Sequence, residues 1–510
     1  MTRDPLLAGV DVGTTSIKAI IFEPGGKIAA AASVPTPVHY PQPGWAYYEP
    51  EEIWQAVVSV LRQATGQLSD AGRVVSVAVA SVGEAGVPLD KNGQPTYYSI
   101  AWFDTRTQPQ ALWLEQQIGK DNLFAVSGLS LQPIFTLCKI LWVRENEPDV
   151  FARTVRWLNM ADFIAYRLSG VAAAEYSLAS RTLLLNLKKL QWDTGLIREV
   201  GLPSDLLAPL QPSGTPLGSV TADAAAATGL PVSCLVATGG HDHVCGSLAT
   251  GVTGPGTLLN SIGTAEAIFL SLSQPLTDPQ MGRQGYTQGA HVVAGSYYVL
   301  GGTYTAGACV EWWREIVGTQ IDYATLVAEA ERVPVGSLGI AFLPHLRLAN
   351  APNDDPKGRG AFIGLSADAK RSEMFRAILE GLAYEFRLTL EPLLQYAGLD
   401  AVESIIAAGG VTRNQLAMQI RATVVNQTIT VAEVTESTSL GVAILGGLAA
   451  GVYRDVAEVL DLVNYRRWPV EPLAEYVEFY NSYYQQVYRH IYPALRPLHH
   501  AVYPLVHQGG

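Results

Sequence analysis

The chain of 510 residues is too long for one ordinary hydrophobic core, and its length indicates two domains of about 250 residues each. Hydrophobic residues make up 48% and charged residues 16%, which supplies material for buried cores and argues against disorder. A net charge of −12, with no basic stripe along the chain, excludes broad binding to nucleic acids or to an anionic membrane surface.

The cysteines and the chain's apolar segments indicate its compartment. Cys138, Cys234, Cys245 and Cys309 are scattered without CxxC spacing, which predicts buried thiols in a reducing compartment and neither a disulfide framework nor a zinc site. The first residues, MTRDPLLAGV, lack the long apolar core of a secretory signal. The longest apolar run, 440–452, is short and contains glycine, so we expect no membrane span and a cytoplasmic location.

The segment DVGTTSIKAIIFE, which begins at Asp11, predicts a β-hairpin that binds phosphate. An apolar lead-in forms one strand, a Gly-Thr turn follows, and a β-branched run forms the second strand. Gly13, the hydroxyls of Thr14 and Thr15 and the turn N–H groups can hold phosphate oxygens, Lys18 adds a positive charge, and Asp11 can hold Mg²⁺ through water. A P-loop would run into a helix instead. An ordinary Gly-Thr turn is the alternative.

A second segment repeats this pattern about 250 residues downstream. SIGTAEAIFL, which begins at Ser261, again has a Gly-Thr turn, at Gly263 and Thr264, followed by an apolar strand. Two such hairpins, one in each half, would place two turns on opposite walls of a cleft that grips a nucleotide's phosphates. Duplication is therefore the working hypothesis, with domains at 1–246 and 247–510.

A sugar-binding side is predicted between the two hairpins. The strand 73–80 delivers Glu84 at its carboxyl end, where ligands collect in open α/β sheets. Trp102, Asp104 and Arg106 then come together, a combination that suits a polyhydroxylated ligand. The alternatives are a solvated carboxylate at Glu84 and a plain Asp-Arg ion pair. Residues 112–170 are expected to be mostly helical, and 175–187 to cap the substrate side.

Asp242 is the candidate general base. An apolar strand runs into Gly239-Gly240, and Asp242 stands where a helix could begin, so its carboxylate can face the cleft and take a proton from an attacking hydroxyl. The flanking His241 and His243 raise the possibility of a metal site. We disfavour that interpretation because their alternating positions point in opposite senses and no further ligand cluster is near.

The C-terminal half predicts a shelf for adenosine. A long amphipathic helix over 373–394, with Ser372 as its N-cap, precedes a strand over 404–408. Gly409 and Gly410 follow that strand and lead into a helix, an arrangement in which a flat purine can lie against the backbone.

In this order, the segments resemble those of the FGGY carbohydrate kinases, members of the actin-like ATPase superfamily, from Leu6 to about Val452. The two hairpins look like the family's phosphate segments, GGHDHVCGSLATG like its catalytic segment, and AAGGVTRNQLAMQIRATVVNQ, which contains Asn414, like its adenosine segment. The most specific matches are GAFIGLSADAKRSEMFRAILE and KILWVREN. The resemblance implies an α/β fold of two ribonuclease-H-like domains, each a mixed five-stranded sheet with helices, closing on a cleft.

Departures from the family pattern concern the substrate. Where glycerol kinases carry an Arg-Glu pair and a Tyr, this chain has Gly83, Glu84 and Ile134, which disfavours glycerol. Xylulose kinases usually carry Met-His at the Gly83-Glu84 position, so the resemblance does not establish D-xylulose as the substrate. A Glu-Arg pair common in the family is replaced by Ala349 and Asn350. The combination of GEAG and GGHDH looks most similar to kinases grouped with L-fuculose and related ketose kinases.

The resulting hypothesis is an ATP- and Mg²⁺-dependent kinase that phosphorylates a primary hydroxyl of a ketose or related polyol. Its predicted site residues are Asp242 as base and sugar ligand; Glu84, Trp102, Asp104 and Arg106 at the sugar; Asp11 at Mg²⁺; Gly13, Thr14, Thr15, Lys18, Gly263 and Thr264 at the phosphates; and Gly409, Gly410 and Asn414 at adenosine. Alternative substrates are gluconate, erythritol and glycerol. Alternative functions are a nucleotide-switch ATPase of actin type and a sugar-binding protein without kinase activity. The oligomeric state is left open, with a homodimer among the options.

Overall fold

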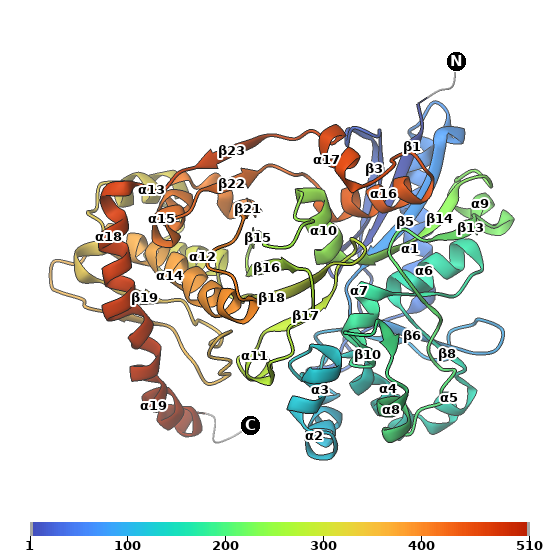
Figure 1. Cartoon of the computed structure of the whole chain (residues 1–510), viewed down its shortest axis with the longest axis horizontal. Helices are drawn as coiled ribbons and strands as arrows, with labels where there is room; N and C mark the ends of the chain where they lie inside the picture. Colours follow the sequence, from blue (N-terminus) through green and yellow to red (C-terminus); the bar gives the residue numbers. More distant parts are fainter. Residues whose placement is uncertain (1–3, 507–510) are drawn as a thin grey trace.

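Two mixed β-sheets, one in each half of the chain, form the centre of the computed structural model, which describes residues 4–506 (Figure 1). Helices cover both sheets, so the predicted class, an α/β protein of two domains, is confirmed. Among the described residues, no helix is long and apolar enough to cross a membrane.

The N-terminal sheet has six strands, in the spatial order β13 (Pro216–Ser219), β14 (Leu235–His241), β5 (Val74–Ser81), β1 (Leu6–Val12), β2 (Ser16–Phe22) and β3 (Ile28–Pro35). β1, β2 and β3 form an antiparallel meander, as predicted, whereas β1, β5 and β14 run parallel. β1 and β5 are buried along nearly their whole length, which fits central strands covered on both faces.

The C-terminal sheet repeats this topology with seven strands, in the order β17 (Thr287–Ala290), β18 (Tyr297–Thr303), β16 (Glu266–Leu272), β15 (Thr257–Ile262), β21 (Ser404–Ala408), β22 (Ile429–Ala432) and β23 (Arg467–Val470). β15, β16 and β18 are antiparallel, and β15, β21 and β22 are parallel. The repeated order supports duplication. The expected five strands form the centre of each sheet, but β13, β17 and β23 add edge strands, which occupy backbone groups that would otherwise stay unpaired.

The rest of the N-terminal domain adds the helix α1 (Pro50–Gly66) and a series of shorter helices to the sheet. Its helices are α2 (Gln108–Gln117), α3 (Lys120–Ser127), α4 (Thr136–Asn146), α5 (Pro148–Arg153), α6 (Met160–Ser169), α7 (Tyr176–Ala179), α8 (Thr194–Glu199) and α9 (Ala222–Thr228). The prediction that 112–170 is mostly helical missed β8 (Arg156–Asn159), which pairs with β6 (Gly86–Leu89). β8 has only four residues, and a run this short, with Trp157 and Leu158 buried, shows no hydrophobic periodicity that would distinguish a strand from a helix.

In the C-terminal domain, the short helix α11 (Pro279–Arg283) contacts α3 of the N-terminal domain. The others are α12 (Gly307–Val317), α13 (Tyr323–Glu331), α14 (Arg371–Ala397), α15 (Gln415–Val425), α17 (Val456–Leu462), α18 (Ala474–Tyr483) and α19 (Arg489–Val506). The N-cap prediction for α14 was wrong: Lys370 holds that position, and the Ser372 hydroxyl donates to Glu373 Oε2 at 2.8 Å.

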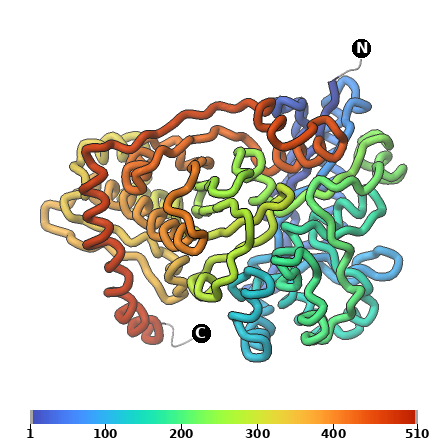
Figure 2. The backbone as a smooth tube through the Cα atoms, in the orientation of Figure 1, coloured from blue at the N-terminus to red at the C-terminus, as the bar shows by residue number. Residues whose placement is uncertain are grey.

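Two helices lie between the sheets. α10 (Asp242–Thr250) packs on α16 (Ser437–Ala449), and α16 contacts β1, β5 and β14 although it comes late in the chain. Figure 2 shows this return of the chain, where the red C-terminal segment lies beside the blue N-terminal strands. Apolar residues of both sheets and both helices form one shared core. The predicted division between residues 246 and 247 falls inside α10.

Glycines allow the close approach of α16. A Cβ at Gly9 would lie 2.0 Å from the carbonyl oxygen of Ser439, and a Cβ at Gly441 would lie 1.8 Å from that of Cys245. Backbone therefore meets backbone both where α16 crosses the sheet and where it crosses α10. A second contact between the domains joins α3 to α11, with an ion pair between Asp121 and Arg283.

Candidate active site

The carboxyl ends of three parallel strands bring the predicted carboxylates to one edge of the N-terminal sheet. Asp11 in β1 is in register with Ala80 in β5, and His241 at the end of β14 is in register with Ser81. Glu84 lies in the loop after β5, and Asp242 directly follows β14. Neighbouring parallel strands of an open α/β sheet present their ligand groups at this edge, so three residues distant in sequence face one region.

Asp242 is the first residue of α10, which places its carboxylate at the positive end of the helix dipole. Its Oδ1 accepts a hydrogen bond from the His243 N–H at 2.6 Å and lies 3.3 Å from His241 Nε2. Burial raises the pKa of Asp242, and the nearby Glu84 adds to the rise, whereas His243 and Arg181 oppose it. A carboxylate with a raised pKa is better matched to accepting a proton from a hydroxyl than a fully solvated one.

A polar network behind Asp242 fixes the junction between β14 and α10. The N–H of His241 donates to Ser177 Oγ at 2.9 Å, and Ser177 Oγ donates to Glu175 Oε2 at 2.6 Å. Ser213 Oγ donates to the other oxygen of Glu175. The expectation that 175–187 caps the substrate side stays a prediction, although the start of this segment lies beside the candidate base. The segment also helps to position Asp242, because Ser177 binds the backbone N–H of His241, the residue before it.

Glu84 is engaged by an arginine that the sequence analysis did not single out. Its Oε1 accepts from Arg181 Nε at 2.7 Å and lies 2.5 Å from Arg181 Nη2. The backbone carbonyl of Glu84 accepts from Lys139 Nζ at 2.6 Å. Arg181 stands alone in the passage YSLASRTLLL, without a motif around it. A single cation in an otherwise small and apolar segment was its only sequence signal.

The first phosphate hairpin is closed at its turn. Thr36 Oγ1 donates to the Gly13 carbonyl at 2.7 Å, and Trp102 Nε1 donates to Thr14 Oγ1 at 3.0 Å. Trp102 therefore stands between the predicted sugar side and the predicted phosphate turn. Thr15 is exposed at the tip of the hairpin.

Lys18 reaches across to the C-terminal part of the chain. Its Nζ lies 2.7 Å from Glu436 Oε2, with both side chains 29% exposed. Glu436 directly precedes α16, so this ion pair joins the first hairpin to the helix between the sheets. Its predicted contact with phosphate stays a prediction.

Asp11 fits a cation ligand. Its Oδ1 atom is buried and has no hydrogen-bond partner within residues 4–506. Burial and then the charge of Asp242 raise the pKa of Asp11 to about 7, against the lowering effect of Lys18. Mg²⁺ is usually held by one or two carboxylates plus phosphates and waters rather than by a full protein cage. In the described part of the chain, no cluster of three or more metal-ligating side chains occurs, at His241 and His243 or elsewhere.

Asp104 and Arg106 are bound to each other. The Arg106 Nη2 atom donates to Asp104 Oδ2 at 2.7 Å, and the two side chains are 1% and 0% exposed for Arg106 and Asp104. The guanidinium also stacks on Trp45, 3.8 Å from the ring centroid, and Asp104 accepts from the Ala46 N–H. The pair therefore fastens the loop that carries Trp45 and Ala46 to the domain. Neither side chain is free to meet a ligand in this arrangement.

A cavity of about 760 Å³ lies at the second hairpin. Four predicted residues line it, Gly263, Thr264, Gly410 and Asn414, together with residues the sequence analysis had not named: Gly307, Ala308, Val310, Glu311, Trp312, Glu315, Tyr323, Val411 and Arg413.

Backbone contacts build the floor of this cavity. The N–H of Gly307 donates to the Gly263 carbonyl at 3.0 Å, which ties the turn to the start of α12. Gly409 has φ +111°, and a Cβ there would lie 2.4 Å from the Ile262 carbonyl oxygen, so glycine is required. Asn414 caps α15 and donates to the Tyr323 hydroxyl at 2.7 Å. The cavity has the size and the glycine-lined wall that a nucleotide needs.

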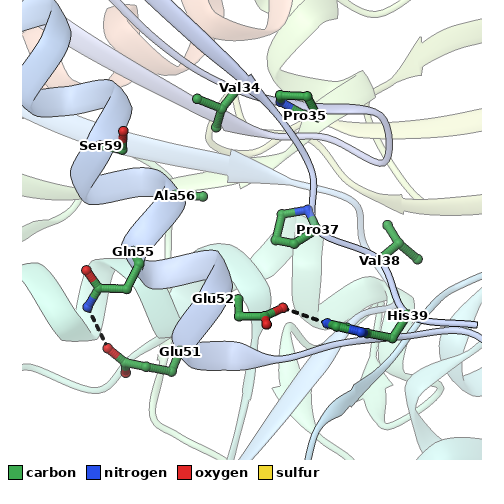
Figure 3. A pocket seen from close by; sticks show the side chains of 10 residues that line it. All are labelled: Val34, Pro35, Pro37, Val38, His39, Glu51, Glu52, Gln55, Ala56 and Ser59. Carbon is green, nitrogen blue, oxygen red and sulfur yellow. Dashed lines mark hydrogen bonds and ion pairs between the residues drawn. The ribbon is translucent and has the colours of Figure 1, made fainter.

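A separate groove of about 610 Å³ lies between the end of β3 and α1 (Figure 3). His39 Nε2 and Glu52 Oε2 lie 2.6 Å apart across it. None of the predicted site residues lines this groove.

Comparisons with known proteins agree with this geometry. Residues 6–249 match the N-terminal domain of the FGGY family of carbohydrate kinases, and residues 258–450 match its C-terminal domain. Xylulose kinase of Bacillus subtilis (strain 168) is 28% identical over 479 residues, which cover 93% of this chain and 94% of that protein. Gluconokinase of the same organism is 29% identical over 482 residues, covering 92% and 93%.

The fold comparison leads to the same group. The crystal structure of xylulose kinase from Rhodospirillum rubrum superposes with a TM-score of 0.90 at 27% identity and covers 97% of this chain and 100% of that one. Because the two family models together span most of the chain, the protein belongs to the FGGY family of carbohydrate kinases and is an ATP-dependent sugar kinase.

Proposed function

We propose that the protein phosphorylates a primary hydroxyl of a ketose or related polyol, with Asp242 as the general base. The observation that carries this proposal is the placement of Asp242 at the start of α10, near enough to both Asp11 and Glu84 for the charges to interact. The base thus lies near a candidate metal ligand and a candidate sugar ligand. The cavity at the second hairpin supplies room for the nucleotide.

In this proposal the chain acts mainly by positioning. Asp242 takes the proton of the sugar hydroxyl as its oxygen attacks the γ-phosphorus of ATP, and ADP leaves. Asp11 would hold Mg²⁺, which would supply charge neutralisation at the phosphates. Gly13, Thr14, Thr15 and Lys18 would contact phosphate from one domain, and Gly263 and Thr264 from the other.

The sugar side rests on fewer residues than the sequence suggested. Glu84 and Trp102 remain candidate ligands, since both lie at the edge that carries Asp242. Asp104 and Arg106 would act through the loop they hold rather than by direct contact. Among the ketoses, L-fuculose, xylulose and ribulose types are favoured. Xylulose kinases among the relatives support the second, and the GEAG and GGHDH segments support the first.

The identity of the substrate is tested by sugar-dependent ADP release. Purified protein with Mg-ATP is assayed against L-fuculose, D- and L-xylulose, D- and L-ribulose, L-rhamnulose, D-gluconate, erythritol and glycerol. We expect one ketose to raise ADP release far above background, with the matching sugar phosphate formed. Slow hydrolysis that no sugar changes would count against the proposal and favour a nucleotide switch.

The role of Asp242 is tested by Asp242→Asn. The amide keeps the size and the hydrogen bond from His243 but cannot accept the proton, so turnover should fall on the order of 10² to 10⁴ while ATP binding is retained. Asp223→Asn, exposed on α9, is the matched control and should keep full turnover. Near-normal turnover in Asp242→Asn would overturn the assignment.

A further inference from the structure

Arg181 is buried, and the proposed reaction gives it no role. It belongs to a short 3₁₀ turn, Ser180–Thr182, and its side chain is 8% exposed, against 7% for Glu84. Its guanidinium carbon lies 5.0 Å from the centroid of the Phe135 ring. A buried charged pair of this kind costs desolvation free energy, so its presence beside the base calls for a functional reason.

The position of Arg181 depends on Gly83. A Cβ at residue 83 would lie 2.6 Å from Arg181 Cγ and 2.8 Å from His241 Cδ2. Any other residue at 83 would therefore displace the arginine or the histidine. Gly83, Glu84 and Arg181 thus form one unit, in which the glycine makes room for the pair.

The pair leaves one donor and one acceptor for a ligand. Both contacts of Arg181 fall on Oε1 of Glu84, so Oε2 lies outside the pair. Arg181 interacts with the buried Tyr298 hydroxyl, but neither Nη1 nor that hydroxyl forms a hydrogen bond of good geometry in the part of the chain that the structure describes. A hydroxyl group donates and accepts at once, so this combination suits a polyol.

The charges around the pair disfavour a sugar acid. Glu84 takes up the charge of Arg181, and Lys139, which is fully buried, donates to the Glu84 carbonyl. His241 is buried, which lowers its pKa well below the usual value and keeps the ring neutral, and Asp242 adds negative charge nearby. His243 is exposed and faces Asp242. A carboxylate placed here would lose water and meet the like charges of Glu84 and Asp242, while Arg181 is already paired with Glu84 and Lys139 is directed at a backbone carbonyl.

We propose that the Glu84–Arg181 pair makes the sugar site select uncharged ketoses and polyols and reject aldonates such as gluconate. This inference rests on the proposed function, because it assigns selectivity to the site that Asp242 serves. Glu84 supplies the repulsion, and Arg181 holds Glu84 in place and offers Nη1 to a hydroxyl.

The test compares wild type with Glu84→Gln on two substrates, the ketose with the highest turnover in the panel above and D-gluconate. The amide can still accept from Arg181 but leaves the guanidinium charge uncompensated. We expect the ratio of kcat/KM for ketose over gluconate to fall at least tenfold, mainly through a lower KM for gluconate. Glu51→Gln is the matched control, since it alters a Glu–Arg pair on α1, 2.8 Å from Arg167, and should leave the ratio unchanged.

A binding measurement makes the test independent of turnover. D-gluconate should raise the Tm of Glu84→Gln but not that of wild type, whereas the ketose should raise the Tm of wild type. Wild-type protein that binds or phosphorylates gluconate as well as the ketose would overturn the inference and leave the kinase assignment intact. An unchanged ratio in folded Glu84→Gln would also overturn it. Absence of phosphorylation of any sugar would instead count against the proposed function.

Discussion

Asp355 is a single carboxylate that fastens the C-terminal helix to the body. The Tyr492 hydroxyl donates to its Oδ2 at 2.5 Å, and His500 Nε2 lies 2.6 Å from the same atom. Burial opposes ionisation, but the hydrogen bonds from Tyr492 and His500 lower the pKa of Asp355 to about 2. One side chain thus anchors α19, which has few other buried residues.

The lowered pKa gives this contact a defined pH dependence. The ionised form is favoured by folding, so its contribution to stability is present above the ordinary pKa of 3.8 and is lost as the pH falls toward 2. Asp355→Asn should lower the free energy of unfolding by about 1–3 kcal/mol between pH 5 and 7. Urea denaturation should show that its difference from wild type narrows at pH 3.5.

The exposed Asp400 gives the control for this change. Asp400→Asn should stay within about 0.5 kcal/mol of wild type across the same range. A difference between Asp355→Asn and wild type that persists unchanged at pH 3.5 would show that the ionised carboxylate is not what holds α19.

Residues differed in how far their position could be predicted. Asp242 was predictable at the start of a helix because a strand, two glycines and a carboxylate stand together in sequence. The Glu84–Arg181 pair was not, because its members lie 97 positions apart and no local pattern links them. Asp104 and Arg106 were predicted to lie beside the sugar, which stays a prediction; their contacts with Trp45 and Ala46 could not be predicted, because those residues come from a distant segment.

At the scale of elements, the close crossing of α10 and α16 depends on Gly441, which has no side chain. Gly441→Ala would put a methyl group 1.8 Å from the Cys245 carbonyl oxygen, and backbone on both sides leaves little room to give way. The variant should lose about 3 kcal/mol of unfolding free energy, the upper end of overpacking costs. Chemical denaturation measures this loss, and turnover should fall as well, because α10 begins with Asp242.

A glycine elsewhere in a helix shows the contrast. Gly66 ends α1, is exposed, and has nothing within 4 Å of an added Cβ. Gly66→Ala should therefore be neutral or gain about 0.5–1 kcal/mol. Equal changes in unfolding free energy for the two substitutions would show that glycine is not needed at position 441 for the close crossing.

The sequence predicted those helices and strands whose own residues show a hydrophobic periodicity with turn or cap residues at the ends. The two hairpins, the strand before Gly409 and the helix after Asn414 each have an apolar period bounded by turn or cap residues. β8 and the edge strands lack such a period and depend on pairing with distant segments. The start of α14 shows the same limit, since Lys370 rather than Ser372 occupies the cap.

At the scale of the whole molecule, the two domains share a core. The repeated strand order followed from the repeated hairpin, but the position of α16 between the sheets did not, because its contacts with β1 and β5 join the two ends of the chain. A purely sequential division into halves therefore separates a helix from the sheet it covers.

The shared core predicts that the N-terminal half is not independent. A fragment of residues 1–256 lacks α16 and should expose the apolar face formed by β1, β5 and β14. We expect it to bind a hydrophobic dye and to aggregate, whereas the full chain does neither. A monomeric fragment with cooperative urea unfolding would contradict this expectation.

The late position of α16 also sets an order of events on the ribosome. The last strand of the N-terminal sheet emerges about 200 residues before α16, an interval on the order of 10–40 s at common rates of translation. During that time the surface around Gly9 and Gly239, which later receives α16, stays open. Nascent chains should therefore remain dependent on chaperones until translation has passed residue 449.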